Sequence, residues 1–315
     1  MESPDVTTDS TSNERPAQRW WQKVLHHRLA GVIGALVLLI FVVLALGAHW
    51  FAPYSTTNAS GAVFEPPSGR HWLGTSDGGI DMVSLLIQGG RISMLVGFSA
   101  ALVAAIPGAL VGILSGYFGG AIDTILMRIT DFFLVIPVIP VMIVIAAVWG
   151  PSLFHLIIAI GVLLWTTTAR VLRAQVKTLR ERTFVRRTVN LGASRTRVLF
   201  RHILPHVAPL LIAQTVITMA LAIFYETALA FIGLGDPTAI SWGTIIEDGF
   251  LRTAISTGAW WAIVPPGVCV ALVVISAYLV GQSIEEALNP RLRVANLSPR
   301  SWTVRPLVGR GREAL

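Results

Sequence analysis

Charge is scarce in this sequence. Only 13% of its 315 residues are charged, whereas 54% are hydrophobic. Soluble domains carry about 25% charged residues, so the composition excludes an ordinary soluble protein and indicates one embedded in a membrane. The formal net charge of +7 would suit a nucleic-acid partner. Most of the basic residues, however, lie just outside long apolar runs, where anionic lipid accounts for them. We therefore predict membrane lipid, and no nucleic acid, as a partner.

Residue types that carry chemistry are scarce as well. Cys269 is the only cysteine, so a disulfide within the chain is excluded. The seven histidines are scattered without the spacing of metal ligands, and we predict no metal site. No phosphate-binding loop of the form G-x-x-x-x-G-K followed by Ser or Thr occurs in the sequence, so the chain does not hydrolyse ATP by that route. We predict no catalytic residue and no cofactor in this chain.

Long apolar runs, by contrast, are abundant. A helix needs about 20 apolar residues to cross a hydrocarbon core of ~30 Å. Six runs predict an all-α integral membrane protein with six transmembrane helices, at Leu29–Trp50, Ile92–Leu114, Ile125–Trp149, Leu153–Thr168, Val207–Leu234 and Trp261–Gln282. Pro137 and Pro140 interrupt the third span. A signal peptide does not suit the first run, which is too long and lacks a convincing cleavage site.

The spans divide the chain into a disordered N-terminus (1–17), a membrane domain (18–288) and a basic tail (289–315). Within the domain, residues 18–28 include two tryptophans among basic residues, which predicts a short helix lying in the membrane interface. Residues 51–91 and 239–258 are predicted to be irregular loops. Three glycines at intervals of four predict a closely packed helix face: Gly108, Gly112 and Gly116.

The distribution of Lys and Arg predicts the orientation. Ten of them lie between Arg170 and Arg201, six lie in the tail from Arg291, and four lie between Arg15 and Arg28. The loops on the other side offer only Arg70, Arg91 and Arg252. Because basic loops stay in the cytoplasm, both termini and the segment Arg180–Pro205 are predicted to be cytoplasmic.

Arg180–Pro205 is the longest strongly polar segment between two apolar runs, and it predicts a docking element at the membrane surface. Its first half reads as an amphipathic helix, with Arg182, Arg186 and Asn190 on one face. Gly192 interrupts this helix, Ala193 and Ser194 can open a second one, and Pro205 marks the next break. A helix that stops and restarts at an angle commonly needs a left-handed residue, which favours glycine. The alternative is a basic interfacial helix held by anionic lipid.

Two acids fall in or near apolar spans, Asp131 and Glu226. A charged group at a helix centre costs about 2.5–3.5 kcal/mol on insertion scales, so each is expected to face a partner or a cavity. Either residue could line a substrate path or relay protons, or it could be a buried hydrogen-bonded group that holds helices together. For Asp131, with Arg128 nearby, the structural role is favoured.

Several motifs occur in an order that resembles one family, the C-type inner-membrane permease subunits of ABC importers for dipeptides, oligopeptides and nickel. The likeness extends from about Trp20 to Arg291. The motifs that carry it are His71-Trp72-Leu73-Gly74-Thr75 with Asp81, Gly89-Gly90-Arg91-Ile92-Ser93, Gly116-Tyr117-Phe118-Gly119-Gly120, Leu191-Gly192-Ala193-Ser194, Arg201-His202-Ile203-Leu204-Pro205, Glu226 before Phe231-Ile232-Gly233-Leu234-Gly235, Ser241-Trp242-Gly243 and Leu288-Asn289-Pro290-Arg291.

The resemblance implies that the polar segment couples the permease to an ATPase subunit. The matching positions are Arg186, Arg187, Thr188, Gly192, Ala193, Ser194, Leu204 and Pro205. The family pattern has Glu-Ala-Ala where this chain has Arg186-Arg187-Thr188, so the contact made by that glutamate does not carry over.

The resemblance also implies the partners and the place of action. It predicts a second, homologous permease subunit, two ATPase subunits that bind ATP and Mg, and an extracytoplasmic substrate-binding protein. The expected site is the bacterial plasma membrane, and the expected cargo is a short peptide. Alternatives are a permease for nickel or another small solute, or a proton-coupled secondary transporter that uses Glu226 or Asp131.

Overall fold

The computed structural model describes residues 16–252 and 254–288. Five of the six predicted spans each fall on one long helical stretch, and the third falls on two helices, Gly120–Val135 and Val138–Trp149, with a break between them. Within the described residues the only β-pairing is an isolated bridge between Thr75 and Asp81. Residues 1–15 and 289–315 lie outside the described part, and with them most of the predicted disordered N-terminus and the whole basic tail.

Four groups of helices follow one another along the chain. The first is α1 (Pro16–Leu46) with the short α2 (Ala48–Phe51), and a loop then leads to α3 (Met82–Phe118). The second group contains α4 (Gly120–Val135), α5 (Val138–Trp149) and α6 (Leu153–Arg180). The third group contains α7 (Thr183–Asn190), α8 (Arg195–Val198), a π-helical turn (Leu199–Ile203), α9 (Leu204–Leu229) and a second π-helical turn (Ala230–Leu234). The last contains α10 (Trp242–Leu251), a 3-10 turn (Trp260–Ala262) and α11 (Val264–Leu288).

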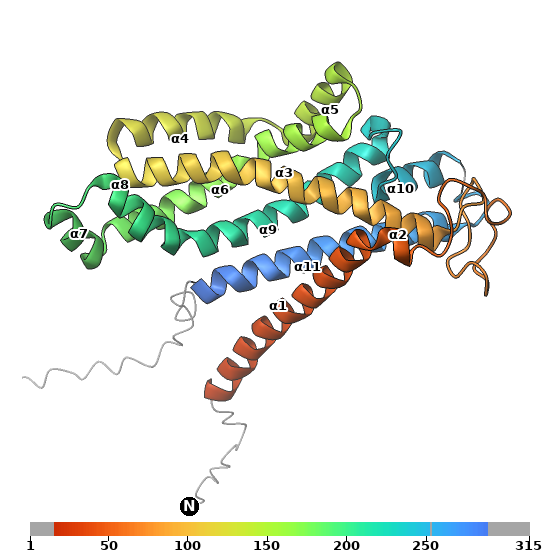
Figure 1. Ribbon diagram of the computed structural model, residues 1–315, viewed down its shortest axis with the longest axis horizontal. Coiled ribbons are helices and arrows are strands. Elements are labelled where there is room, and N and C mark those ends of the chain that lie inside the picture. Colours follow the sequence, from red (N-terminus) through yellow and green to blue (C-terminus); the bar gives the residue numbers. More distant parts are fainter. Residues whose placement is uncertain (1–15, 253, 289–315) are drawn as a thin grey trace, which may run out of the picture.

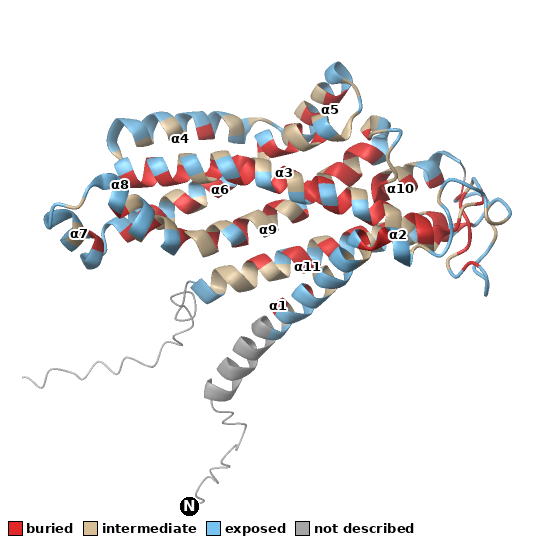
Figure 2. Cartoon of the chain, viewed as in Figure 1, coloured by how far each residue is buried: buried red, intermediate tan, exposed pale blue. Residues whose placement is uncertain are grey.

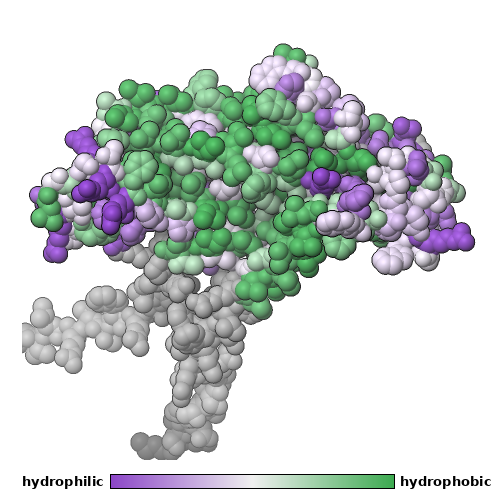
Figure 3. Space-filling model, in the orientation of Figure 1, coloured by the Kyte–Doolittle hydropathy of each residue, from purple (hydrophilic) through white to green (hydrophobic). Residues whose placement is uncertain are grey.

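The long helices run along the bundle, and shorter elements gather at its two ends (Figure 1). One end carries α7 and α8, and the other carries α10, α2 and the loop before α3. The start of α1 and the end of α11 both point toward the α7–α8 end. A broad hydrophobic zone separates two hydrophilic ends on the face seen in Figure 3. This is the distribution expected of a protein that crosses a membrane along its long axis.

Five helical stretches in the described chain are long and apolar enough to span a membrane: Leu29–Leu46, Met82–Phe118, Leu153–Arg180, Arg195–Leu234 and Trp260–Leu288. The pair α4 and α5 makes a sixth if it is counted as one span, with a bend of 81° between its halves. The break falls where Pro137 predicts it. Ile136, which precedes this proline, takes an extended backbone conformation because the proline ring disfavours a helical one there.

The glycine stripe on α3 brings this helix against α6. A Cβ atom on Gly108, Gly112 or Gly116 would lie within 3 Å of a backbone oxygen of α6. These three positions therefore let two helix backbones approach more closely than any side chain would allow. The predicted close-packing face is confirmed, and its partner is a helix of the same chain.

Several predicted boundaries are wrong. The residues predicted as a separate interfacial helix, 18–28, are the first part of the unbroken α1. The second span begins at Met82 rather than Ile92 because Gly89 and Gly90 lie inside the helix, where the absent side chains make room for α10. The fourth span continues past Thr168 to Arg180, since its last three turns are amphipathic rather than apolar.

Two further corrections concern the second half of the chain. The predicted loop 239–258 contains α10, whose N-terminus is fixed by a reciprocal capping box between Ser241 and Thr244. Pro205 does not break the helix: it directly follows the π-helical turn Leu199–Ile203, and the backbone on both sides of this junction stays helical. The chain therefore stays helical from Arg195 through the first π-helical turn and α9, and it kinks in the second π-helical turn, where Gly233 has a φ of +81°.

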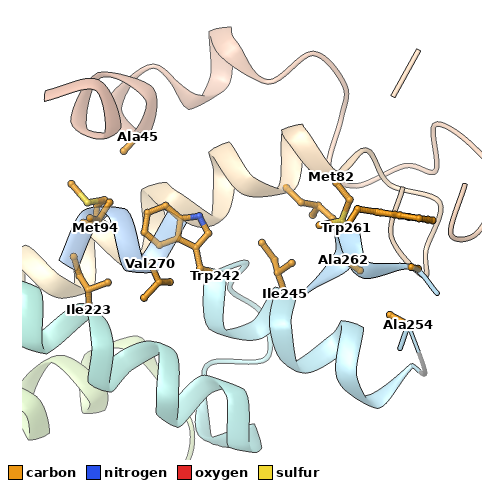
Figure 4. Packing of buried hydrophobic residues seen from close by; sticks show 13 residues of the cluster. Ala45, Met82, Met94, Ile223, Trp242, Ile245, Ala254, Trp261, Ala262 and Val270 are labelled. Carbon is orange, nitrogen blue, oxygen red and sulfur yellow. The ribbon is translucent and has the colours of Figure 1, made fainter. Parts of the chain in front are cut away.

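Buried residues run along the middle of the bundle (Figure 2), and two of their hydrophobic clusters lie near its two ends. The cluster in Figure 4 surrounds Trp242 of α10 with residues from α1, α3, α9 and α11. The Trp242 side chain is 1% exposed and donates from Nε1 to the carbonyl oxygen of Leu86 at 2.9 Å. The second cluster lies beneath α7 and α8 and includes Val185, Val198, Ile203, Leu172 and Val176.

Candidate functional site

The α7–α8 hairpin is built around one glycine. The α7 helix ends at Asn190, and Gly192 then adopts a φ of +82°. A Cβ atom there would meet nothing within 4 Å, so the backbone conformation rather than crowding requires glycine. Ser194 caps α8 by accepting a hydrogen bond from the backbone N–H of Arg197 at 3.3 Å. The prediction of a left-handed glycine between two helices is confirmed.

Buried apolar residues hold the hairpin to the bundle. Val185 of α7 is 1% exposed, and Val198 and Ile203 are fully buried against α6 and α9. Burying a valine or isoleucine side chain contributes about 1.5–3 kcal/mol. These few contacts hold the hairpin against α6 and α9.

The structure brings most of the predicted coupling residues together on this hairpin. Arg186 and Arg187 are exposed on α7, and Arg186 forms an ion pair with Glu181 in the preceding turn. Thr188 donates its hydroxyl to the carbonyl oxygen of Phe184 at 2.8 Å. The remaining positions follow along the chain: Gly192, Ala193 and Ser194 in the turn, and Leu204 and Pro205 after the first π-helical turn.

Asp131 does not pair with the nearby Arg128. It accepts a hydrogen bond from Arg170 of α6 at 2.6 Å, and both side chains are about half exposed, at 51% and 52%. A second and less exposed pairing was not predicted. Asp123 of α4 contacts Arg173 at 2.5 Å and Lys177 at 2.7 Å.

Together these ion pairs fasten α4 to α6 at two levels. The signal was present in the sequence, because Asp123 and Asp131 are eight residues apart and share one face of a helix. Arg170, Arg173 and Lys177 share a face in the same way. Recognising the pairing would have required knowing that α4 and α6 are neighbours.

Glu226 lies at a junction of three helices. Its side chain is 1% exposed and accepts hydrogen bonds from the hydroxyl groups of Ser93 at 3.0 Å and Thr227 at 3.4 Å. The Ser93 oxygen in turn accepts a hydrogen bond from the backbone N–H of Trp242 at 3.2 Å. One buried polar group therefore links α9, α3 and α10. This geometry favours the alternative in which Glu226 holds helices together.

The other end of the bundle is ordered by a second buried polar pair. His71 contacts Asp81 at 3.0 Å, and these side chains are 3% and 1% exposed. Asp81 also caps α3 by accepting from the backbone N–H and the hydroxyl of Ser84, both at 2.9 Å. Trp261 donates from Nε1 to the carbonyl oxygen of Thr75 at 3.1 Å. The motif residues His71, Thr75 and Asp81 thus shape the loop that precedes α3.

A hollow of about 350 Å³ lies beside this loop and α10, and three acids line it: Asp77, Glu247 and Asp248. Burial raises the pKa of Glu247, and the neighbouring charge of Asp248 raises it further. Arg252 reaches Asp77 at 3.5 Å and offsets part of the negative charge. The two ends of the molecule therefore differ in electrostatic character, with arginines exposed at one end and acids at the other.

These features define a class of protein: a multi-pass, all-α membrane subunit whose one end presents a helix–glycine–helix hairpin. The chain belongs to the family of binding-protein-dependent transport system inner membrane components, which residues 108–294 match. Residues 15–67 match the N-terminal TM domain of oligopeptide transport permease C. The chain is therefore a transport permease subunit rather than an enzyme, and it works with partner subunits.

Similar proteins extend this likeness over almost the whole chain. The di/tripeptide transport system permease protein DppC of Pseudomonas aeruginosa is 34% identical over 304 residues, which cover 94% of this chain and 99% of that protein. The dipeptide transport system permease protein DppC of Bacillus subtilis is 33% identical and covers 90% of both chains. The oligopeptide transport system permease protein OppC of the same organism is 35% identical and covers 83% of this chain and 86% of its own.

Proposed function

We propose that this chain forms half of the translocation pathway of an ATP-driven importer for short peptides. The relatives that support this cargo are named as permeases for dipeptides, tripeptides and oligopeptides. The observation that carries the mechanism is the hairpin, whose buried valines join it to the bundle while its arginines remain exposed. Such an element can pass a displacement from a docked protein into α6 and α9.

The proposal includes four partners. A homologous permease completes the pathway, and two ATPase subunits that bind ATP and Mg dock below it. The coupling residues on this chain are Arg186, Arg187, Thr188, Gly192, Ala193, Ser194, Leu204 and Pro205. An extracytoplasmic binding protein delivers the peptide at the end that carries α10. ATP binding then turns the pathway outward by alternating access.

The proposed orientation places the hairpin and both termini in the cytoplasm of a bacterial cell. It rests on the excess of Lys and Arg near α7 and α8 and on the placement of α1 and α11, which point toward the same end. Asp131, half exposed and paired with Arg170, supports the pathway by tying α4 to α6. Glu226 supports the pathway indirectly, because it ties α10 to α3 and α9.

Reconstitution of the complete complex in lipid vesicles tests this function. We expect uptake of a labelled dipeptide or tripeptide only when the ATPase subunits, ATP and the binding protein are all present. The binding protein loaded with peptide should also stimulate ATP hydrolysis. Peptide uptake driven by a proton gradient without the ATPase subunits would favour the secondary-transporter alternative, and uptake of nickel instead of peptide would replace the cargo.

A further inference from the structure

We propose that the α7–α8 hairpin docks through an exposed apolar knob, Leu191, with arginines on two sides of α7. We further propose that it fits an ATPase subunit whose docking groove has an acidic rim around an apolar floor. This inference rests on the proposed function and adds a selection rule to it. Charge complementarity decides which ATPase subunit this permease accepts.

The charge of the hairpin is strongly one-sided. Seven arginines lie between the end of α6 and the first π-helical turn, and all are exposed: Arg180, Arg182, Arg186, Arg187, Arg195, Arg197 and Arg201. Over the same stretch Glu181 is the single acid, and it is already engaged by Arg186. Guanidinium groups match carboxylates with paired hydrogen bonds, so a protein surface that satisfies this hairpin must present several Asp or Glu side chains.

The most exposed apolar side chain of the hairpin lies at its tip, and Val189 and Phe200 are exposed as well, at 47% and 65%. The side chain of Leu191 is 88% exposed, the highest value among the large hydrophobic side chains in the described part of the chain. It stands beside Gly192, which has no neighbouring atom within 4 Å of its Cβ position. A leucine at the point of a polar hairpin gains about 1.5–3 kcal/mol when a partner buries it. An apolar anchor surrounded by charges is the usual make-up of a specific protein interface.

The arrangement of the arginines distinguishes a protein groove from a flat lipid surface. Arg182 and Arg187 line a hollow of about 1070 Å³ between α7 and helices α6, α9 and α11. Arg180, Arg186 and Arg195 line another, of about 540 Å³, that faces the end of α3. The positive charges therefore lie on two sides of α7. The hairpin also projects from the hydrophilic end of the molecule, beyond the apolar zone (Figures 1 and 3). A groove can surround such a shape, whereas a membrane surface meets one side of it.

The test measures binding of the purified, fluorescently labelled ATPase pair of the importer to the permease pair in nanodiscs of uncharged phosphatidylcholine. Three variants probe the surface: Arg187→Glu and Arg197→Glu reverse its charge, and Leu191→Ser removes the knob. Arg70→Glu is the matched control, since it reverses an exposed arginine in the loop before α3 at the opposite end. Binding is measured at low salt and at ~1 M salt, where the screening length falls to about 3 Å.

We expect each reversal at Arg187 or Arg197 to weaken binding by about tenfold or more at low salt, and much less at high salt. Leu191→Ser should weaken binding at both salt concentrations, because its contribution is not electrostatic. Arg70→Glu should bind like the wild type. Replacing a single groove carboxylate of the ATPase by Lys should restore binding to one of the two reversed variants.

Three results would overturn the inference, and they can be told apart. Binding that is unaffected by salt and by both reversals would show docking without charge selection, and the importer function would stand. Association of the hairpin with discs of anionic phosphatidylglycerol, with no change in ATPase binding among the variants, would assign the arginines to lipid. No binding of the wild-type permease to the ATPase pair under any condition would refute the proposed function itself.

Discussion

Gly192 is the residue whose backbone conformation matters most to the hairpin. Its φ of +82° costs an ordinary L-residue about 1–2 kcal/mol, and more for a β-branched one. This strain is too small to unfold the membrane bundle but large enough to re-aim a short surface helix. We expect Gly192→Val to insert and express normally, while ATP hydrolysis by the partner subunits loses its link to peptide uptake.

The measurement for this variant is peptide-stimulated ATP hydrolysis and uptake in complexes of matched composition. Gly69→Val is the control, because Gly69 also has open space around its Cβ position but no left-handed backbone. If ATP hydrolysis and peptide uptake stay coupled in Gly192→Val as in the wild type, the docking role of the hairpin is refuted. Impaired coupling in Gly69→Val as well would show that the method responds to any added valine.

Substitutions of Glu226 test the buried junction of α3, α9 and α10. Glu226→Gln keeps the size of the side chain and an oxygen that can accept from Ser93, so we expect assembly and uptake close to those of the wild type. Glu226→Leu leaves the hydroxyl of Ser93 without its acceptor in a buried site, which costs about 1–3 kcal/mol. We expect this variant to assemble but to transport poorly, because α10 loses its tie to α9. Equal uptake by the leucine variant and the wild type would show that the carboxylate neither lines the pathway nor is needed to hold the helices together.

At the scale of secondary-structure elements, α4 depends on its ion pairs with α6. Asp123 is 13% exposed and contacts two cations, whereas Asp131 and Arg170 are half exposed. Exposed pairs contribute about 0–1 kcal/mol, and hydrogen bonds to charged groups in less exposed places about 1.5–3. We expect Asp123→Ala to lower the thermal midpoint of the purified protein clearly more than Asp131→Ala does. Equal shifts of the thermal midpoint would mean that the lower exposure of Asp123 does not make its ion pairs more stabilising than that of Asp131.

Element boundaries also show how far the sequence could be interpreted. The break at Pro137 was predictable because the residue before a proline avoids the helical conformation. The presence of α10 was not, since residues 239–258 contain no long apolar run and the helix depends on its capping box and on burial of Trp242. The length of α6 was underestimated for a related reason: Arg173 and Lys177 look like the end of a span, but both contact Asp123 of α4 from within the continuing helix.

In the candidate site, too, some features could be predicted from the sequence and others could not. Gly192 and the capping Ser194 could be predicted, because local backbone chemistry determines a helix–glycine–helix turn. The partners of Asp131 and Glu226 could not, because Arg170 and Ser93 are distant in sequence and meet them only after the helices have packed. Position along the chain identifies which residues are unusual, whereas packing decides what they contact.

For the whole molecule, orientation is the prediction to check first. Ser68 and Ser194 are both exposed and lie toward opposite ends of the bundle, so each can accept a reporter cysteine in a Cys269→Ala background. We expect an impermeant thiol reagent applied to intact cells to label the cysteine at position 68 and not the one at position 194. Permeabilised cells, in which both should react, are the control. Labelling of both or neither in intact cells would refute the assigned orientation.

The helix that runs from Arg195 through the first π-helical turn to Leu229 has a mechanical consequence. Its 35 residues make a rod of roughly 50 Å that starts at the hairpin and carries Glu226 near its far end. We expect a rod of this kind to tilt or slide as one body. A displacement of its hairpin end then reaches the Glu226 end directly, without a series of small side-chain movements. The π-helical turns Leu199–Ile203 and Ala230–Leu234, the second with Gly233 at a φ of +81°, are the places where the backbone can bend within and just beyond this rod.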